Sequence, residues 1–546
     1  MSLPLILPAS PQNPDNVPAI KPQIPTANRN TEQRVFLEKA DTMRKQTVDS
    51  FLVLIGNVEF SRGGMHMFCD SAHYYPEIES LDCFGNVWMQ QGDTLSAKGD
   101  SLKYRNDTQL CTIYGTPVTM RNRDVQLQTD EFIYDLYSEF GYYNVGGVLT
   151  DKSNRLESVE GEYVPATKEA TFYDNVHLTS TEESGAPLHI YTDTLYYNTN
   201  THLAQLFTLS VIIKNGDTIF TTRGDYDTNT GVANLFNRSK VKMERGTTLE
   251  GDTLFYDRNA GYGWARGNME IVDSAKQSTL RGDYGYYDQV IDSSYVTGHA
   301  VAMEYSKGDT LYVHGRELFS FRTLDTTHFE ADTLTGTAAY ERVDTSHVLI
   351  AHPRVRFFRT DMQGICDSLR MQQRDSLMYM YRHPIVWSDD RQIFGNVIKI
   401  HFNDSTFDRA TLPEFGFTAQ HVAEDFYNQL SGKEMIAYFE DQEMKRLDVN
   451  GNVEAIMLPM ENDSTYNKII NLESSYLKAL FEKQQIQWMK MWPETGGTVT
   501  PLYLSKKSQY YLPKFKWYTG LRPTSPEDIF IIPKEMDELM ESGDVK

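Results

Sequence analysis

A phrase of about thirty residues recurs along this chain and constrains its fold more than any other feature. The first half of the phrase contains Gly-Asn-Val or a near copy, in Ile55–Val58, Phe84–Val87 and Tyr114–Val118. The second half is led by Asp and carries an aromatic residue, in Asp70–Tyr74, Asp100–Tyr104 and Asp130–Tyr134. A fixed period in this range indicates stacked supersecondary units that share one continuous core.

Apolar and polar residues alternate inside each copy of the phrase. The apolar members stand two positions apart: Val58 and Phe60, Val87 and Met89, Val118 and Met120, Val241 and Met243, Val301 and Met303. A period of two predicts a strand with one buried and one solvated face. Helices are not expected, because Gly, Asn, Thr and β-branched residues recur where a helix needs Ala, Leu or Glu.

Turn residues punctuate the alternating segments. Gly-Asp-Thr recurs at 92–94, 216–218, 251–253 and 308–310 and predicts tight reversals, since Gly adopts positive φ and Asp bonds nearby backbone. The Gly-Asn pairs are interpreted as turns, and the Asp that leads each second half as a turn or strand-start residue. The sequence therefore predicts an all-β fold of elongated, stacked antiparallel strands, with about two strands in each repeat and a short C-terminal tail.

The charge of the chain limits its partners. The formal net charge is −23, from 75 acidic and 52 basic residues among 546. Nucleic acid is not expected as a partner, because neutralising phosphates requires basic patches. The negative net charge also argues against general electrostatic attraction to an anionic membrane surface. An anionic ligand must therefore be held by its apolar part or by a local cluster of Lys and Arg.

No motif of catalysis or of metal binding stands out. The chain has no nucleophile elbow, no H-E-x-x-H, no phosphate loop and no dinucleotide fingerprint, so we expect neither an enzyme nor a cofactor or metal. The four cysteines, at 69, 83, 111 and 366, are too scattered for a disulfide framework. We interpret them as small buried hydrophobic residues, although Cys83 and Cys111 stand about one repeat apart.

The repeated phrase resembles that of the OstA-like (organic solvent tolerance A-like) family of lipopolysaccharide-transport proteins, of the periplasmic bridge type. The resemblance is carried by F-x-G-N-V followed by G-D-x-L-x-Y, in Phe84–Val87 with Gly92–Leu95 and Asp100–Tyr104. Gly251–Tyr256 followed by Gly267–Met269 repeats it. The resemblance covers residues 50–310 well and 345–480 loosely.

The resemblance implies a β-jellyroll, folded over like a taco, whose apolar interior carries the acyl chains of lipid A. From periodicity alone, a lipid-binding groove and a core filled by side chains both remain open. The positions that the resemblance assigns to the groove are Val58, Phe60, Val87, Met89, Val118, Met120, Val176, Leu178, Val241, Met243, Val301, Met303, Val355 and Phe357.

The chain divides into four expected segments. Residues 1–34 are rich in Pro and are interpreted as a leader with an incomplete signal peptide, residues 35–320 as OstA-like repeat modules, residues 321–505 as more divergent repeats, and residues 506–546 as a C-terminal cap or docking tail. Within the tail, a short acidic helix is expected from Pro533 to Met540. The expected location is the periplasm, in association with the cell envelope.

The leading functional hypothesis is a periplasmic protein that shields lipid A acyl chains in an apolar groove and bridges the inner and outer membranes. Its partners would be lipopolysaccharide and other lipopolysaccharide-transport proteins, joined by edge-strand addition. A homo-oligomer is a further expectation. The alternatives are a polysaccharide-active enzyme on a β-helix scaffold and a structural or adhesive β-repeat protein.

Overall fold

The structure is a computed structural model that describes residues 34–45, 50–180, 186–305, 308–329, 340–372, 376–403, 406–440, 443–461, 465–483 and 485–541. The leader and signal remnant predicted over residues 1–34 lie outside the described residues, except at residue 34. None of the described helices is long and apolar enough to span a membrane.

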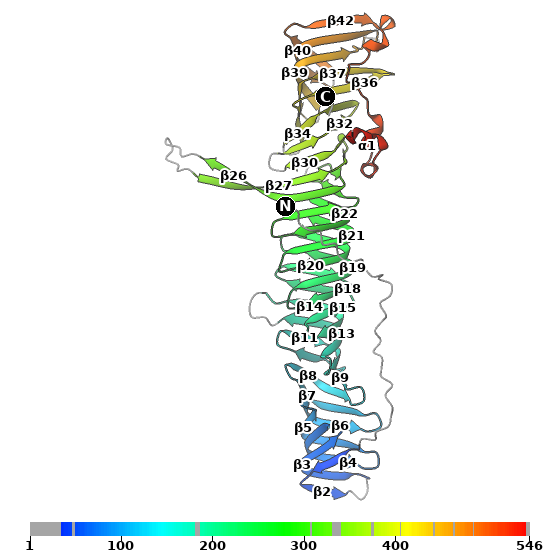
Figure 1. Cartoon of the computed structure of the whole chain (residues 1–546). Helices are drawn as coiled ribbons and strands as arrows, with labels where there is room; N and C mark the ends of the chain where they lie inside the picture. Colours follow the sequence, from blue (N-terminus) through cyan, green and yellow to red (C-terminus); the bar gives the residue numbers. More distant parts are fainter. Residues whose placement is uncertain are drawn as a thin grey trace. The chain divides into compact units, whose positions relative to one another are not determined.

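The described residues confirm the predicted all-β class (Figure 1). All strand pairs whose register is described are antiparallel. This contradicts the β-helix scaffold of the enzyme alternative, because a β-helix of that kind stacks parallel strands. The chain divides into two compact units, Met1–Asp174 and Asn175–Lys546, and the division falls inside β13 (Glu169–Ser180).

The first unit contains twelve complete strands among its described residues. They are β1 (Phe36–Lys39), β2 (Thr42–Lys45), β3 (Leu52–Arg62), β4 (Met65–Tyr75), β5 (Ser80–Gln91), β6 (Leu95–Arg105), β7 (Leu110–Asn122), β8 (Val125–Asp135), β9 (Phe140–Tyr143), β10 (Gly147–Thr150), β11 (Asn154–Ser158) and β12 (Glu160–Val164).

The second unit begins its complete strands with β14 (His189–Asn198), β15 (Leu203–Leu206), β16 (Ser210–Lys214), β17 (Asp217–Thr221), β18 (Arg223–Asp227), β19 (Val232–Lys242), β20 (Thr247–Asp257), β21 (Tyr262–Asp273), β22 (Ser278–Asp288), β23 (Ser293–Thr297), β24 (Val301–Glu304), β25 (Leu311–His314), β26 (Glu317–Phe329) and β27 (Tyr340–His352). It continues with β28 (Val355–Arg359), β29 (Met362–Cys366), β30 (Ser368–Gln372), β31 (Leu377–Tyr381), β32 (Ile385–Ser388), β33 (Arg391–Gly395), β34 (Val397–Asn403), β35 (Thr406–Leu412), β36 (Gly416–Ala423), β37 (Phe426–Gly432), β38 (Glu434–Glu440), β39 (Glu443–Met457), β40 (Lys468–Glu482), β41 (Gln485–Trp492) and β42 (Gly496–Pro501). Its last segment holds the 3-10 turns η2 (Leu502–Leu504), η3 (Lys507–Gln509), η4 (Thr519–Leu521) and η5 (Asp528–Phe530) and the helix α1 (Lys534–Glu541), which confirms the expected acidic helix.

The long strands of the first unit bend in the middle and so build two layers. The first half of β3 pairs with β2 and the second half pairs with β1, on either side of a register shift between Ile55 and Val58. The pairs from β3–β4 to β7–β8 all carry such a shift near their centres. Apolar side chains from both halves, such as Leu54 and Phe60, are buried. We call the side of β2 layer 1 and the side of β1 layer 2.

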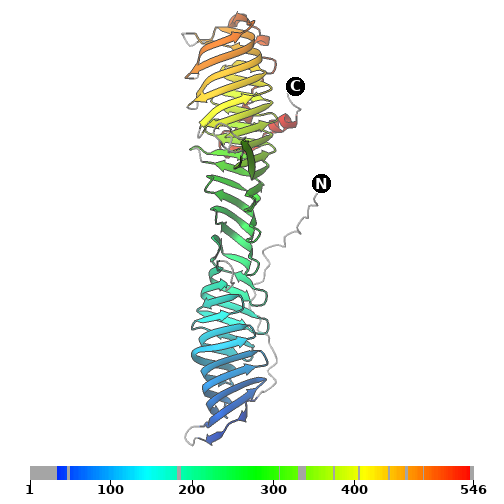
Figure 2. The same cartoon turned by 90° about the vertical axis from the view of Figure 1, so that its left-hand side faces the viewer.

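The second unit repeats this arrangement (Figure 2). The first half of β19 pairs with β18, which defines layer 1 of this unit, and the second half pairs with β17, which defines layer 2. The pairs β19–β20, β20–β21 and β21–β22 again shift register near their centres. Two long edges result: a bend edge, where strands pass between the layers, and a turn edge, where hairpin turns join strands of the same layer.

The predicted turns at the Gly-Asn pairs are wrong, because these residues lie inside strands at the bend edge. Gly85 and Asn86 stand in the middle of β5, with φ values of 74° and 43°, and the same pair occupies the middle of β3, β21 and β39. A dipeptide with two positive φ values serves a bulge as well as a reversal. The Gly-Asn pairs therefore have the positive φ values expected of a turn, but they lie at bends within strands and not at reversals.

The Asp residue that leads the second half of the phrase also lies at the bend edge and not at a strand start. The Asn of the Gly-Asn pair donates its amide to an Asp carboxylate: Asn86 to Asp70 of β4 at 2.7 Å, Asn268 to Asp252 of β20 at 2.8 Å, and Asn57 to Asp41, between β1 and β2, at 2.9 Å. His299 contacts Asp283 in the same way at 2.9 Å. Each pair is separated by 16 residues. We call this contact the bend clasp.

The Gly-Asp-Thr triplets divide between the two edges. Residues 92–94 and 216–218 lie at reversals, as does 308–310, between β24 and β25. The triplet 251–253 lies inside β20, where Asp252 accepts the bend clasp from Asn268. That one prediction of a reversal is wrong, because the bend and the reversal use the same residue types.

One hairpin interrupts the repeat in the second unit. The strands β26 and β27 pair along their whole length, from Glu317 with His352 to Phe329 with Tyr340. Only the proximal residues are described as pairing with β23 and β30. The distal part projects from the neighbouring strands (Figure 1).

We expect Gly85→Ala to destabilise β4 and β5 more than Gly92→Ala does. Both glycines have positive φ, which costs an L-residue about 1–2 kcal/mol. A Cβ at Gly85 would lie 2.6 Å from Oδ2 of Asp70, whereas a Cβ at Gly92 meets nothing within 4 Å. The first substitution should therefore also break the bend clasp, at a cost of about 1 kcal/mol more. Hydrogen exchange measured by mass spectrometry over β4 and β5 checks this, and equal exchange in the two variants contradicts it.

Candidate functional site

Most residues predicted to line a groove lie inside, between the two layers. Val301 and Met303 are exceptions, because they pair with Arg281 and Thr279 on the face of β24 opposite to Ala302. Met303 is half-buried, and the other thirteen are buried: Val58, Phe60, Val87, Met89, Val118, Met120, Val176, Leu178, Val241, Met243, Val301, Val355 and Phe357. At the buried positions other than Val301, side chains fill the interior of each unit. Their contact with lipid stays a prediction.

A row of buried tyrosines follows the turn edge in layer 1 of each unit. The members are no more than 5% exposed, and they recur about once in every thirty residues. They are Tyr104, Tyr134 and Tyr163 in the first unit and Tyr197, Tyr226, Tyr256 and Tyr287 in the second. A tyrosine suits this place because its ring packs inside while its hydroxyl seeks a polar partner. We call this set the tyrosine row.

The tyrosine row of the first unit contacts residues at the strand ends of layer 2. Asn122, at the end of β7, donates to the hydroxyl of Tyr163 at 3.0 Å. The guanidinium carbon of Arg62, at the end of β3, lies 5.4 Å from the ring centre of Tyr104. These contacts join the two layers across the turn edge, where the backbone does not cross.

Charged groups take this role in the second unit. Asp217, the first residue of β17 in layer 2, accepts a hydrogen bond of 2.6 Å from the hydroxyl of Tyr256 in layer 1. Burial, and next the bond to Asp217, raise the pKa of Tyr256. Arg258, just after β20 in layer 1, lies 3.8 Å from the Asp217 carboxylate and donates to Tyr226.

The next cross-layer contact borders a cavity of about 140 Å³. Lys276 bonds Asp292 across the turn edge at 3.3 Å, and Tyr287 donates to the same carboxylate at 3.2 Å. Burial raises the pKa of Tyr287 to about 12. The cavity combines these polar groups with apolar side chains such as Ile271 and Leu280. It is thus a small amphipathic opening into the interior.

A larger cavity of about 640 Å³ lies between the strands near the C-terminal end of the second unit. Its apolar lining includes Leu447, Ile456, Leu477 and Met489. A smaller cavity of about 50 Å³ shares Arg391, Thr418 and Leu447 with it. The larger volume falls within the roughly 300–1,000 Å³ that is typical of small-molecule sites.

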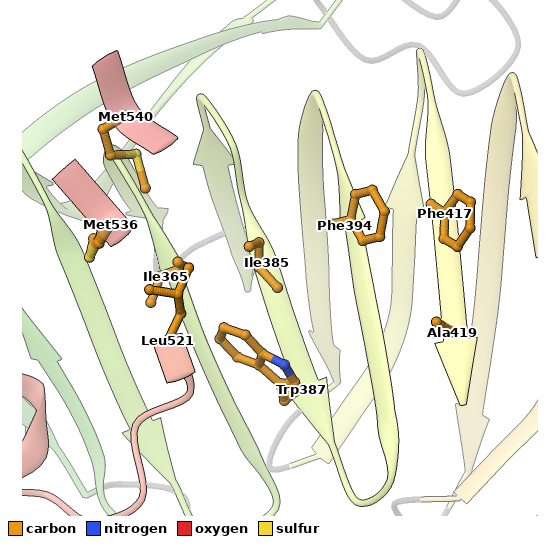
Figure 3. Close-up of a cluster of buried hydrophobic side chains, with 9 residues drawn as sticks. All are labelled: Ile365, Ile385, Trp387, Phe394, Phe417, Ala419, Leu521, Met536 and Met540. Atoms are coloured by element: carbon orange, nitrogen blue, oxygen red, sulfur yellow. The ribbon is translucent and has the colours of Figure 1, made fainter. Parts of the chain in front are cut away.

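The outer face of this cavity's wall is covered by residues 502–541, which we call the C-terminal strap. Alternate residues of β33 and β36 divide between the two faces. Arg391 and Thr418 line the cavities, while Phe394 and Phe417 pack against the strap. Figure 3 shows Leu521, Met536 and Met540 of the strap in the same apolar cluster as Ile365, Ile385, Trp387, Phe394, Phe417 and Ala419.

Three buried glutamines fix the strap. Gln429 donates to the carbonyl of Tyr510 at 2.7 Å and accepts from the amide of Leu512 at 2.8 Å. Gln392 makes the same pair of bonds with Lys516 and Tyr518, both at 2.9 Å. Gln363 accepts from Arg522 at 2.9 Å. The side chains of Gln429 and Gln392 thus each bond one carbonyl and one amide of the strap, as a neighbouring strand would.

The cysteines play the structural role that the sequence predicts. All four are buried and free of disulfides. A hydrogen bond with Cys69, followed by burial, raises the pKa of Cys83, and burial raises that of Cys111. The same hydrogen bond with Cys83 lowers the pKa of Cys69, so the raised pKa that marks an unreactive core thiol applies to Cys83 and Cys111.

Three features of the site escaped prediction. The tyrosine row was visible as the aromatic of the Asp-led phrase, but the period alone assigned it no role. The strap and the larger cavity depend on pairs such as Gln392 and Lys516, which are 124 residues apart. The structure places the expected cap or docking segment on the outer face of these strands, and its role stays a prediction.

Comparison with known proteins identifies two families. Residues 32–186 and 207–301 match the family described as OstA-like protein, and residues 143–244 match the family described as lipopolysaccharide-assembly, LptC-related. No curated protein matches the chain. Among solved structures the chain is similar to LptH, the LptA homologous periplasmic component of the lipopolysaccharide transport device from Pseudomonas aeruginosa, at 11% identity and a TM-score of 0.20. That match covers 26% of this chain and 95% of LptH.

We expect Gln392→Ala to loosen the strap. The substitution leaves the Lys516 carbonyl and the Tyr518 amide without their partner, at a cost of about 1–3 kcal/mol for each group that stays buried. Limited proteolysis should then cut residues 502–541 faster than in the wild type. Gln420→Ala is the matched control, because Gln420 lies on the cavity side of β36 and bonds Asp390. Equal cutting in both variants would contradict the role of Gln392 in holding the strap.

Proposed function

Because this chain belongs to the OstA-like lipopolysaccharide-transport family, we propose that it shields the acyl chains of lipid A between its two layers. The lipopolysaccharide-assembly match over residues 143–244 supports the same ligand. The sugars would lie outside, beyond the turn edge. As part of the same proposal, the protein acts by binding and not as an enzyme.

The observation that carries the proposal is the apolar interior and its larger cavity. A cavity of about 640 Å³ lies between the strands of the second unit, and its lining combines apolar side chains with polar ones such as Asp390, Gln420 and Asn428. An acyl chain that enters it gains about 0.8 kcal/mol for each methylene removed from water. Ten methylenes therefore contribute on the order of 8 kcal/mol before the costs of association. No cationic patch is needed for such binding, which suits a chain of net charge −23.

Elsewhere the interior is filled by side chains, so the predicted groove residues would contact lipid only in an opened arrangement. Val87, Met89, Val241 and Met243 are buried, so they do not border open space. Lipid could lie against them only after the two layers part along the turn edge. Methionine side chains suit such a lining, since they repack easily.

The bridging role rests on the strand edges. Among the described residues, β41 and β42 pair only with β40, so their outer backbone groups face away from the sheet. Unpaired edges accept a further strand. We propose that other lipopolysaccharide-transport proteins, or a second copy of this chain, add strands there, and that this happens in the periplasm at the cell envelope.

A photoreactive residue at Leu477 should crosslink to lipopolysaccharide when the protein is expressed in cells that make it. Leu477 lines the larger cavity, whereas its neighbour Lys478 does not and serves as the control. A second photoreactive residue at Met243 tests the filled interior. We expect lipid crosslinks at Leu477 and Met243 and none at Lys478, read by immunoblot against lipopolysaccharide. Crosslinks to protein alone at both interior positions would defeat the proposal.

The substitution Val499→Lys should weaken strand addition at the C-terminal edge. Val499 is exposed on β42, and a lysine on an edge strand opposes pairing. Val290→Lys is the matched control, because Val290 is equally exposed but lies in a turn. Light scattering over a concentration series, alone and with candidate transport partners, should show weaker association for V499K only. Unchanged association of V499K would contradict strand addition at this edge.

A further inference from the structure

We infer that the guanidinium of Arg258, in a cluster with Asp217, Tyr226 and Tyr256, binds the anionic group of the amphiphile at the turn edge. The class of ligand is a lipid whose acyl chains carry a phosphate or a carboxylate at the junction with the polar part. This inference rests on the proposed function, since it places one group of the same ligand.

The four residues lie where such a junction must pass. Asp217 begins β17 in layer 2, and Arg258 follows β20 in layer 1, so the cluster spans the turn edge. The interior beside it is apolar, with Ile219 and Leu254 buried. A ligand with its acyl chains inside and its sugars in water has its junction at this boundary.

Within the cluster, the guanidinium of Arg258 has donors that lack hydrogen-bond partners. Asp217 accepts hydrogen bonds at both carboxylate oxygens, from Tyr256 at 2.6 Å and from the amide of Glu244 at 3.0 Å. Arg258 donates from Nη1 to Tyr226, but its Nε and Nη2 are buried without a hydrogen-bond partner. The Arg258 side chain is only 6% exposed, and the Asp217 carboxylate at 3.8 Å is too far for a hydrogen bond.

The two unpartnered nitrogens form one edge of the guanidinium plane. That edge presents two parallel N–H groups, which match two oxygens of a phosphate or a carboxylate. A buried donor without a partner raises the free energy of the closed arrangement. When the layers part, an anion that bonds this edge removes that penalty, so the ligand stabilises the open arrangement specifically.

The other contacts described across the turn edge lack this property. Arg62, which lies over the ring of Tyr104, has no buried nitrogen without a hydrogen-bond partner. Asn122 and Tyr163 are neutral and bond each other. Lys276 is already paired with both Asp273 and Asp292. Arg258 is therefore the group at the described turn edges that geometry favours as the anion contact.

The test measures binding of three diacyl lipids with identical chains to the full-length protein. One lipid carries a phosphate, one a carboxylate, and one, the diacylglycerol, no charge. We expect the wild type to prefer the anionic lipids, and Arg258→Met to lose that preference by roughly tenfold or more, as expected for a charged bidentate contact. Comparison of the phosphate and the carboxylate tells which group the site takes.

Two further variants make the result specific. Arg238→Met is the matched control, because Arg238 is exposed and its guanidinium bonds Glu250 away from the turn edge. It should keep the wild-type preference. Arg258→Lys keeps the charge but removes the planar edge, so it should lose most of the preference while remaining folded, as checked by thermal unfolding.

The outcomes separate this inference from the proposed function. If no lipid binds any variant, the proposed function fails. If all three lipids bind the wild type equally, or if Arg258→Met and Arg258→Lys weaken all three alike, the proposed function stands and the anion site is overturned.

Discussion

The bend in the middle of each long strand is the constraint on which the rest of this structure depends. At Gly85 the backbone adopts a φ of 74°, and Asp70 lies where a β-carbon would stand. Asn86 then bonds the same carboxylate at 2.7 Å. One glycine, one asparagine and one aspartate thus turn a flat antiparallel sheet into two facing layers, and the bend clasp recurs in both units.

The bends make the two long edges of each unit physically different. Strands pass between the layers at the bend edge, so that edge is covalently closed. At the turn edge the layers are joined by side chains, through the tyrosine row and its partners in layer 2. Contacts between side chains break at a cost of a few kcal/mol, whereas a peptide backbone does not. Any ligand that enters sideways must therefore enter at the turn edge, where the buried side chains of Asp217 and Arg258 lie.

In the C-terminal region, the alternation of side chains along a strand separates the cavities from the strap. Along β33 and β36, one set of side chains faces the cavities and the other faces the strap. Because successive residues of a strand point to opposite faces, the strap supports the wall of the cavity without occupying it. Gln392 and Gln429 bind the strap through its backbone, and strap side chains such as Leu521 and Met536 add apolar contacts.

Several properties of this protein were determined by the sequence by itself. The period of about thirty residues and the Val-x-Met alternation established an all-β fold with two strands in each repeat and an apolar interior, because both signals are local and repeat many times. The meaning of Gly-Asn was decided only by the tertiary structure. The same conformation makes a reversal or a bend, and the choice depends on whether an aspartate 16 residues earlier lies in register beside it. The strap, the cavities and the cluster at Arg258 likewise join residues far apart in sequence, and no local pattern encodes such a meeting.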